Sequence, residues 1–342
     1  MSIKNKYLRF GKVFAVAPMM DWTDRHCRYF HRLMTSNTLL YTEMITSAAL
    51  IRGNAVHLLD YNIAEQPLAL QLGGSDPREL SEAASLGEDR GYTEVNLNIG
   101  CPSSRVRAGS FGAVLMEQPK LVAECITEMR KAVSIDITVK CRIGVDNQNP
   151  EDTLPYFLSE IQEAGVDKVT IHARKALLDG FSPKQNRNIP PLDYEIVSRM
   201  KEKFDDLHIS INGGISTLAS AISLINTDFD GVMVGRAAYN SPWEILSNVD
   251  QTIYNATPKL ITRFDIIMRM IPYIKNHLIN GGKVHQVTRH MIGLFNGEKN
   301  ARKWRQTLTQ EGVLPYADET ILLKAYENMM AATEVETIAD VA

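Results

Sequence analysis

Cys101 is the residue of this sequence whose surroundings most favour a chemical role. It lies in the segment Asn98-Ile99-Gly100-Cys101-Pro102, where a glycine and a proline restrict the loop that follows a short apolar run. A thiol with an ordinary pKa of about 8.5 is mostly protonated near neutral pH. Such a group can donate a proton as an acid or, after losing the proton, act as a nucleophile. The residue pattern by itself is compatible with both roles.

The other three cysteines, Cys27, Cys125 and Cys141, fit the ordinary role of small buried hydrophobic side chains. The chain has no Cys-x-x-Cys pair, and the cysteine spacings match neither a zinc site nor a disulfide framework. We therefore expect no bound metal and a reducing, cytoplasmic compartment. Residues 1–12 are basic but lack the apolar core of a signal peptide. No stretch approaches the ~18 apolar residues of a membrane span, so no membrane association is expected.

Three polar residues form a second group of candidates, because they interrupt or end short apolar runs. They are Gln71, Lys140 and His172. Each of them, taken alone, is also compatible with a hydrogen-bonded interior polar group. A lysine is the hardest of the three to explain in that way, since burying an unpaired charge is costly.

The elements that must position these residues follow an alternating pattern over the first 245 residues. Eight short apolar runs, at 14–19, 39–45, 68–72, 94–99, 137–142, 168–173, 208–212 and 231–234, predict parallel strands. Helical patterns at 77–90, 119–133, 153–164, 193–204 and 217–225 separate them. Eight strand–helix repeats predict an α/β protein with a (β/α)8 TIM barrel. The main competitor, a doubly wound open sheet, usually has fewer strands, and no Gly-x-Gly-x-x-Gly follows the first run.

The strand ends of such a barrel meet at one mouth, where they predict a flavin site. Glycines after the last two strands let backbone N–H groups approach a phosphate, and Arg236 can pair with it. Lys140 can stabilise the anionic reduced ring of flavin mononucleotide (FMN), and Gln71 can hydrogen-bond the pyrimidine part of that ring. His172 can bond the ribityl or phosphate region, and a Pro-Met-Met segment can contact one ring face. The predicted cofactor-binding residues are Pro18, Met19, Met20, Gln71, Lys140, His172, Asn212, Gly213, Gly214, Gly235 and Arg236.

From about residue 260 the pattern changes to amphipathic helices without strand runs. Helices are predicted at 261–280, 284–295, 301–311 and 317–332, after a polar stretch at 255–259. We therefore expect two domains, a catalytic FMN-binding TIM barrel at 1–250 and a helical domain at 260–342.

Segment 281–305 is a candidate surface for nucleic acid. It carries six basic residues against Glu298, a net +5 in a chain whose total is −3, so the rest of the chain carries −8. A local basic patch on an acidic body is what an RNA-binding surface requires. Arg302 and Arg305 of this segment, and Lys184 and Arg187 after the sixth strand, are the candidate RNA contacts. The competing interpretation is a solvated helix face.

The sequence resembles the dihydrouridine synthase family over nearly its whole length, including the helical tail. The matching segments are Ala17-Pro18-Met19, Gln71-Leu72-Gly73-Gly74, Asn96-Leu97-Asn98-Ile99-Gly100-Cys101-Pro102, Lys140-Cys141-Arg142-Ile143-Gly144, Ile171-His172-Ala173-Arg174 and Asn212-Gly213-Gly214. The Asn-x-Gly-Cys-Pro motif around Cys101 is highly specific. Segments 16–27, 182–187 and 189–194 resemble the bacterial A-type branch of the family, which is specific for positions 20 and 20a of transfer RNA (tRNA).

The resemblance implies an oxidoreductase that reduces uridine to 5,6-dihydrouridine in the D-loop of tRNA, at positions 20 and 20a. It implies FMN as cofactor, NADPH as reductant, and hydride transfer from flavin N5 to uridine C6. It also implies that Cys101 protonates C5 from the opposite face, which selects the acid role over the nucleophile. We expect a monomer that binds tRNA through its helical domain.

Extruding a uridine from the tRNA fold costs a few kcal/mol, which contacts to the phosphate backbone can offset. Asn98, beside the cysteine loop, can then read the base edge. Trp304, Phe295 and His290 lie among the basic residues and can either stack on bases or pack the helices.

Two other functions remain as alternatives at this point. The first is an FMN barrel oxidoreductase acting on a small molecule, of the dihydroorotate dehydrogenase or ene-reductase kind, which leaves the basic tail without a role. The second is a non-catalytic RNA-binding protein with a degenerate barrel. Gln71, Cys101, Lys140 and His172 together argue against the second alternative.

Overall fold

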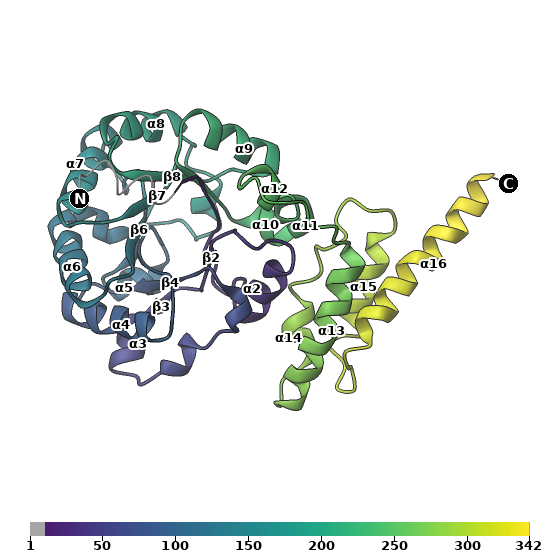
Figure 1. The fold of residues 1–342 in the computed structure, drawn as a ribbon. Helices are drawn as coiled ribbons and strands as arrows, with labels where there is room; N and C mark the ends of the chain where they lie inside the picture. The colour runs from purple at the N-terminus through teal and green to yellow at the C-terminus, as the bar shows by residue number, and fades with distance from the viewer. Residues whose placement is uncertain (1–10, 342) are drawn as a thin grey trace.

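The fold is built around a parallel barrel in which strands and helices alternate along the chain (Figure 1). This computed structural model describes residues 11–341, so residues 1–10, on which the interpretation of the N-terminal segment mainly rests, lie outside the described residues, as does residue 342. The strands are β1 (Val13–Val16), β2 (Leu40–Tyr41), β3 (Ile45–Thr46), β4 (Leu68–Gly73), β5 (Glu94–Ile99), β6 (Asp136–Arg142), β7 (Lys168–His172), β8 (His208–Asn212) and β9 (Gly231–Val234). They pair in the order β1-β9-β8-β7-β6-β5-β4-β2, with β3 also on β4. The predicted α/β barrel with eight strand positions is therefore confirmed.

The second barrel position is split between β2 and β3, although a single strand was predicted over residues 39–45. Both short strands pair in parallel with β4. Between them, Thr42 Oγ1 accepts a hydrogen bond from Gln71 N at 3.0 Å, so a side chain replaces a carbonyl of the ladder. A bridge between Ala15 and Leu39 then joins the first and second positions and closes the barrel.

Helices cover the outside of the barrel and form the C-terminal tail (Figure 1). Those of the barrel are α2 (Arg25–Arg32), α3 (Ser47–Ile51), α4 (Pro77–Asp89), α5 (Ser104–Ala108), α6 (Pro119–Ala132), α7 (Pro150–Glu163), α8 (Tyr194–Lys203), α9 (Leu218–Thr227), α10 (Arg236–Asn240), α11 (Pro242–Leu246) and α12 (Val249–Thr252). Short 3-10 turns occur at Val56–Leu59, Ile63–Glu65, Gly112–Glu117 and Gln185–Arg187. Those of the tail are α13 (Arg263–Ile279), α14 (Val284–Thr288), α15 (Ala301–Gln310) and α16 (Ile321–Val341). No helix among the described residues has the length and apolar composition needed to cross a membrane.

Two tail helices differ from the prediction. The helix predicted over residues 284–295 ends at Thr288, because the chain turns there to bring Gly293 against the barrel. A Cβ atom on Gly293 would lie 2.3 Å from Asn240 O, a contact that a regular helical side chain could not make. The last helix begins at Ile321 and not at residue 317, since Asp318 accepts a hydrogen bond from Thr320 N at 2.9 Å in a preceding turn.

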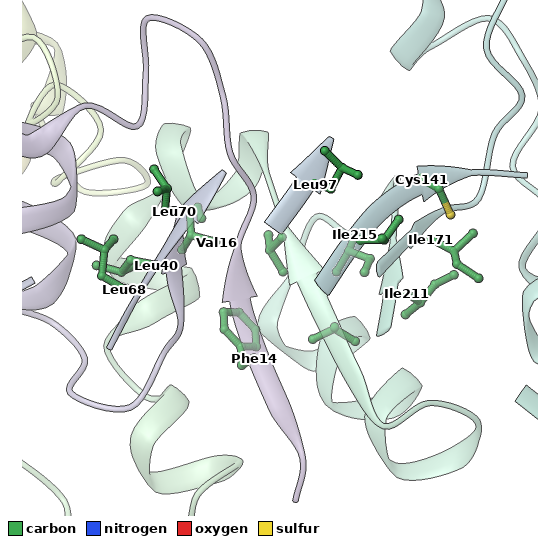
Figure 2. Close-up of a cluster of buried hydrophobic side chains, with 14 of the residues drawn as sticks. Phe14, Val16, Leu40, Leu68, Leu70, Leu97, Cys141, Ile171, Ile211 and Ile215 are labelled. Carbon is green, nitrogen blue, oxygen red and sulfur yellow. The ribbon is translucent and has the colours of Figure 1, made fainter. Parts of the chain in front are cut away.

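Side chains on each strand alternate between a helix-facing core and the barrel interior. Figure 2 shows part of the helix-facing core, with Leu68 and Leu70 of β4 near Leu40. Gln71, the neighbour of Leu70, belongs to the opposite face and points inward. The register places Gln71 beside Asn96 of β5, so the interior at this height is polar.

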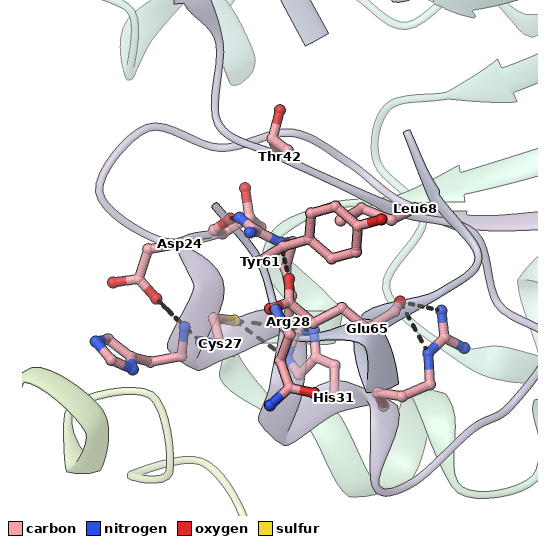
Figure 3. A network of polar contacts seen from close by, with 12 residues as sticks. Asp24, Cys27, Arg28, His31, Thr42, Tyr61, Glu65 and Leu68 are labelled. Atoms are coloured by element: carbon pink, nitrogen blue, oxygen red, sulfur yellow. Dashed lines mark hydrogen bonds and ion pairs between the residues drawn. The ribbon is translucent and has the colours of Figure 1, made fainter. Parts of the chain in front are cut away.

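The tail packs on the barrel through α2 and the short helices after β9. Asp24 caps the N-terminus of α2 by accepting hydrogen bonds from His26 N and Cys27 N, as Figure 3 shows in part. The same carboxylate accepts from Arg289 Nη2 at 2.6 Å and lies 3.0 Å from His290 Nε2. Burial alone would raise the pKa of Asp24, but His290, Cys27 N and Arg289 hold it well below its ordinary value. One carboxylate thus joins a barrel helix to the tail.

Candidate active site

The Cys101 loop is held by two side chains at the mouth of the barrel. Asn98 Oδ1 accepts hydrogen bonds from Gly100 N at 3.1 Å and Cys101 N at 3.0 Å, which folds the chain into a tight turn after β5. Arg142 Nε donates to Gly100 O at 2.9 Å from the next strand. The thiol is half-buried and lies 3.7 Å from Ser103 Oγ. A thiol in this position is presented at the mouth by a loop of fixed shape.

The other three cysteines differ from Cys101 as predicted. Cys27, Cys125 and Cys141 are free thiols and fully buried in the core. Burial raises the pKa of each, to about 12 for Cys125 and Cys141. Their interpretation as small hydrophobic side chains is confirmed, and Cys101 is the cysteine with access to solvent.

Arg142 holds the cysteine loop, a role that the sequence pattern did not predict. Its guanidinium is buried and donates not only to Gly100 O but also to Lys175 O at 2.9 Å and Asn186 O at 3.1 Å. Burial lowers the pKa of this arginine to about 10. The available signal was its position two residues after Lys140, since residues two apart on a strand share a face.

Two successive glycines, Gly213 and Gly214, follow β8. Their φ angles are +112° and +71°, in a region that residues other than glycine rarely adopt. A Cβ atom on Gly213 would lie 2.5 Å from His172 Cδ2, and one on Gly214 would lie 2.4 Å from Leu192. Only glycine fits both positions; Gly213 is buried, and Gly214 is exposed at the mouth.

Asn212 and Lys140 are joined across the interior. Asn212 Nδ2 donates to Met233 O at 2.7 Å, which turns its Oδ1 toward Lys140 Nζ at 3.1 Å. Burial and the neighbouring Arg142 lower the pKa of Lys140 to about 8. An anion bound beside this ammonium group would favour its charged form and so raise the pKa of Lys140.

Two arginines converge on one loop residue beside these glycines. Arg236 Nη1 donates to Asn188 Oδ1 at 2.8 Å, and Arg174 Nη1 donates to Asn188 O at 3.4 Å. Arg174 also donates to Pro190 O, and its Nε is buried without a hydrogen-bond partner. Arg174 was not predicted as a site residue, because its partners are carbonyls of a long loop.

The cations of the mouth have no acidic partner of their own. In the part of the chain that the structure describes, Lys140, Arg142, Arg174 and Arg236 donate to carbonyl and amide oxygens, and neither they nor Arg187 form an ion pair with a carboxylate. Burial and these cations hold the pKa of His172 well below its ordinary value, so its imidazole is neutral at pH 7. Clustered cations without carboxylate partners fit an anionic group such as the phosphate of FMN.

The remaining predicted cofactor residues lie around the same opening. Gln71 is buried, with 1 % of its surface exposed. Pro18 and Met19 are half-buried in the loop after β1, and Met20 is 55 % exposed. A Cβ atom on Gly235 would lie 3.6 Å from Met19 Sδ, so the first and last strand ends meet here.

The predicted RNA contacts fall on two surfaces. Lys184 and Arg187 are exposed on the long loop after β7, whose Asn186 O is held by Arg142. Arg302 is exposed on α15 in the tail, and Arg305 is half-buried there and donates to Asn296 Oδ1 at 3.3 Å. Asn98 lies at the mouth, where its amide already holds the Cys101 loop.

Aromatic stacking on RNA by the tail is not available from the predicted residues. Trp304, Phe295 and His290 are buried, with 0 %, 4 % and 1 % of their surfaces exposed. Trp304 Nε1 donates to Met291 O at 3.0 Å, and its ring meets Phe295 edge to face. Of the two roles left open for these rings, packing of the helices is the correct one.

The chain is similar to known proteins of one family over nearly its whole length. A model of the dihydrouridine synthase family matches residues 15–329. A tRNA-dihydrouridine(20/20a) synthase of Shewanella oneidensis is 49 % identical over 325 residues, covering 95 % of this chain and 96 % of its own. Proteins of the same name from Synechocystis and Vibrio vulnificus are each 50 % identical, over 92 % and 91 % of this chain and 93 % and 95 % of their own.

Proposed function

This chain belongs to the dihydrouridine synthase family, and from that premise we propose that it reduces uridine to 5,6-dihydrouridine at positions 20 and 20a of tRNA. The observation that carries the proposal is the pairing of an accessible thiol, Cys101, with a cation-rich glycine cradle at one barrel mouth. The small-molecule alternative is not supported, since the named relatives, at about half identity over nearly the whole chain, act on tRNA. A tRNA substrate favours the cytoplasm as the compartment.

The proposed cofactor is FMN, reduced by NADPH. Gly213, Gly214, Gly235 and Arg236 would hold its phosphate, by open backbone and by charge. Lys140 would stand at the edge of the ring that becomes anionic on reduction. The remaining contacts would come from Pro18, Met19 and Met20 on one ring face, Gln71 at the pyrimidine part, and His172 and Asn212 toward the ribityl chain and phosphate. When bound and reduced, the cofactor supplies the hydride that adds to C6 of the uracil ring.

The role proposed for Cys101 is that of the acid. Its Sγ–H bond breaks as a C5–H bond forms, so the C5=C6 double bond becomes single and the thiol becomes a thiolate. Solvent then returns the proton. Arg142, which donates to Gly100 O beside Cys101 and has no carboxylate partner among the described residues, would place a positive charge near the sulfur after proton transfer.

The proposed RNA contacts have two roles: four of the residues hold the tRNA phosphates, and one recognises the base. Lys184 and Arg187 beside the mouth, and Arg302 and Arg305 on α15, would hold phosphates of the tRNA. Asn98 would read the base. Its Oδ1 accepts two backbone hydrogen bonds and its Nδ2 donates once, which leaves one Nδ2 hydrogen for the uracil.

Substituting Cys101 tests the function and its acid separately. Cys101→Ala should bind FMN and oxidise NADPH as before, yet give no dihydrouridine in a single turnover with unmodified tRNA. Cys125→Ala, at a buried cysteine of α6, is the matched control and should retain product formation. Full product yield from Cys101→Ala would remove the acid role. Absence of flavin from the purified wild type would instead overturn the proposed cofactor.

A further inference from the structure

A chain of side-chain hydrogen bonds runs through the barrel from the cysteine loop to a buried carboxylate. Asn98 Nδ2 donates to Gln71 Oε1 at 2.8 Å, and Gln71 Nε2 donates to Asn96 Oδ1 at 2.8 Å. Asn96 Nδ2 donates to Thr138 Oγ1 at 2.8 Å. Thr138 Oγ1 donates to Glu94 Oε1 at 2.7 Å. Below Asn98, each member is at most 2 % exposed, so water does not compete for these bonds.

The strand register builds this chain. Gln71 of β4 lies opposite Asn96 of β5, which lies opposite Thr138 of β6. Glu94 and Asn98 stand two residues before and after Asn96 on β5, so all three share the inward face. Polar residues at alternate positions of neighbouring strands therefore form a continuous path along the barrel axis.

The lower end of the path determines which partner donates in each hydrogen bond. Burial alone would raise the pKa of Glu94, but Lys168, with Nζ 2.7 Å from Oε2, and hydrogen bonds from Tyr41 and Thr138 hold the pKa below its ordinary value. An ionised carboxylate can only accept hydrogen bonds. Thr138 must therefore donate its one hydroxyl proton to Glu94, which leaves its oxygen to accept from Asn96.

The upper end fixes the same direction independently. Backbone N–H groups can only donate, so Gly100 and Cys101 require the oxygen of Asn98 to face the loop. The nitrogen of Asn98 then faces Gln71, whose oxygen must accept. Turning over a single amide would bring donor against donor in the interior and leave both buried groups unsatisfied.

We propose that Glu94 and Thr138 are positioning residues for the reaction, acting through Asn96 on Gln71 and Asn98. They fix which atoms of the Gln71 amide face the cofactor and hold Asn98 in the orientation that shapes the Cys101 loop. The proposal rests on the proposed flavin site. Filling the barrel does not require this path, since elsewhere the interior is packed with apolar side chains such as Ala15, Ala69 and Met233.

Thr138→Val is the test, because valine has nearly the shape of threonine but neither donates nor accepts. Asn96 would lose its acceptor, and the amides of Asn96 and Gln71 would then be held from the Asn98 end alone. We expect FMN to remain bound, with a shifted visible absorption spectrum and a changed reduction potential. Reoxidation of the reduced flavin by tRNA should slow by about tenfold or more, as expected for a loss of about 1.4 kcal/mol. Thr138→Ser keeps the hydroxyl and should restore the wild-type spectrum, potential and rate.

A wild-type spectrum, potential and reoxidation rate in Thr138→Val would overturn the proposal. So would equal defects in the valine and serine variants, which would indicate a packing role. If Thr138→Val does not fold, Glu94→Gln decides: a carboxamide can donate to Thr138, so the lower end no longer determines which way the Thr138 hydroxyl donates, while Lys168 keeps Asp136 at 3.1 Å. Unchanged flavin properties in Glu94→Gln would then reject the positioning role. Wild-type protein without FMN would reject the cofactor itself, a separate result.

Discussion

Replacing Arg236 should separate recognition of the cofactor phosphate from recognition of the flavin ring. Arg236 is the first residue of α10, directly follows Gly235, and has only oxygens of a neighbouring loop as hydrogen-bond partners in the described chain. Arg236→Met keeps the aliphatic stem and removes the charge. A hydrogen bond to a charged group contributes about 1.5–3 kcal/mol, which corresponds to roughly a 10- to 100-fold change in dissociation constant.

The assay compares FMN with riboflavin, which lacks the phosphate. Fluorescence quenching of each flavin by the apoprotein gives the two dissociation constants. We expect Arg236→Met to weaken FMN binding about 10- to 100-fold and to leave riboflavin binding within about twofold. Arg174→Met should also weaken the binding of FMN more than that of riboflavin. The guanidinium of Arg174 donates to Asn188 O, and its buried Nε has no hydrogen-bond partner.

Arg199→Met is the matched control for this experiment. Arg199 is an exposed arginine of α8 that pairs with Glu151, so its removal takes away a surface charge without touching the mouth. Both flavins should bind to this variant as to the wild type. Equal weakening of FMN and riboflavin by Arg236→Met, or no change in either, would refute the phosphate role of the mouth.

Two further predictions concern the tail and its junction with the barrel. Charge reversal at Arg302 and Arg305 should weaken tRNA binding without changing the flavin absorbance. The slope of log affinity against log salt concentration should fall by the amount expected for the loss of about two phosphate contacts. Unchanged affinity across a salt series would assign these residues to a solvated face. Burial lowers the pKa of His26, whose Nδ1 lies 2.8 Å from Tyr273 Oη, to about 4. The unfolded chain therefore binds the proton more readily, and stability is lost as pH falls from about 6.5 toward 4, by at most about 3 kcal/mol. Urea unfolding at pH 7 and pH 5 should show a smaller loss in His26→Phe than in the wild type, and equal losses would rule out this contribution.

The barrel was predictable from the sequence because a buried parallel strand is a short apolar run. The same local rule failed where a distant contact decides the backbone. Thr42 divides the second strand by bonding Gln71 N, and Gly293 ends a helix by meeting Asn240 O; in both cases the partners are far apart in the chain. The periodicity of a sequence segment does not reveal its contacts with residues that are far away in the chain.

The site was predictable to the extent that strand ends meet at one mouth. The positions of Cys101, Lys140 and Gly213 near the mouth could be predicted because each lies at or near the end of a run. The roles of Arg142 and Arg174 could not, since their partners are main-chain carbonyls of a loop with no periodic pattern. The direction in which a guanidinium reaches depends on loop conformation and not on residue type.

The loop after β7 joins the proposed acid to the proposed RNA contact. Arg142 donates to Gly100 O, next to Cys101, and to Asn186 O, next to Arg187, from one buried guanidinium. Because a planar guanidinium fixes the angle between its N–H groups, these two loops cannot shift independently without breaking a hydrogen bond. An RNA phosphate held by Arg187 would therefore be placed relative to the thiol by the protein interior. With the proposed roles of Arg187 and Cys101, the distance between the phosphate contact and the proton donor would be set by the folded barrel, and the target uridine would have to fit that distance.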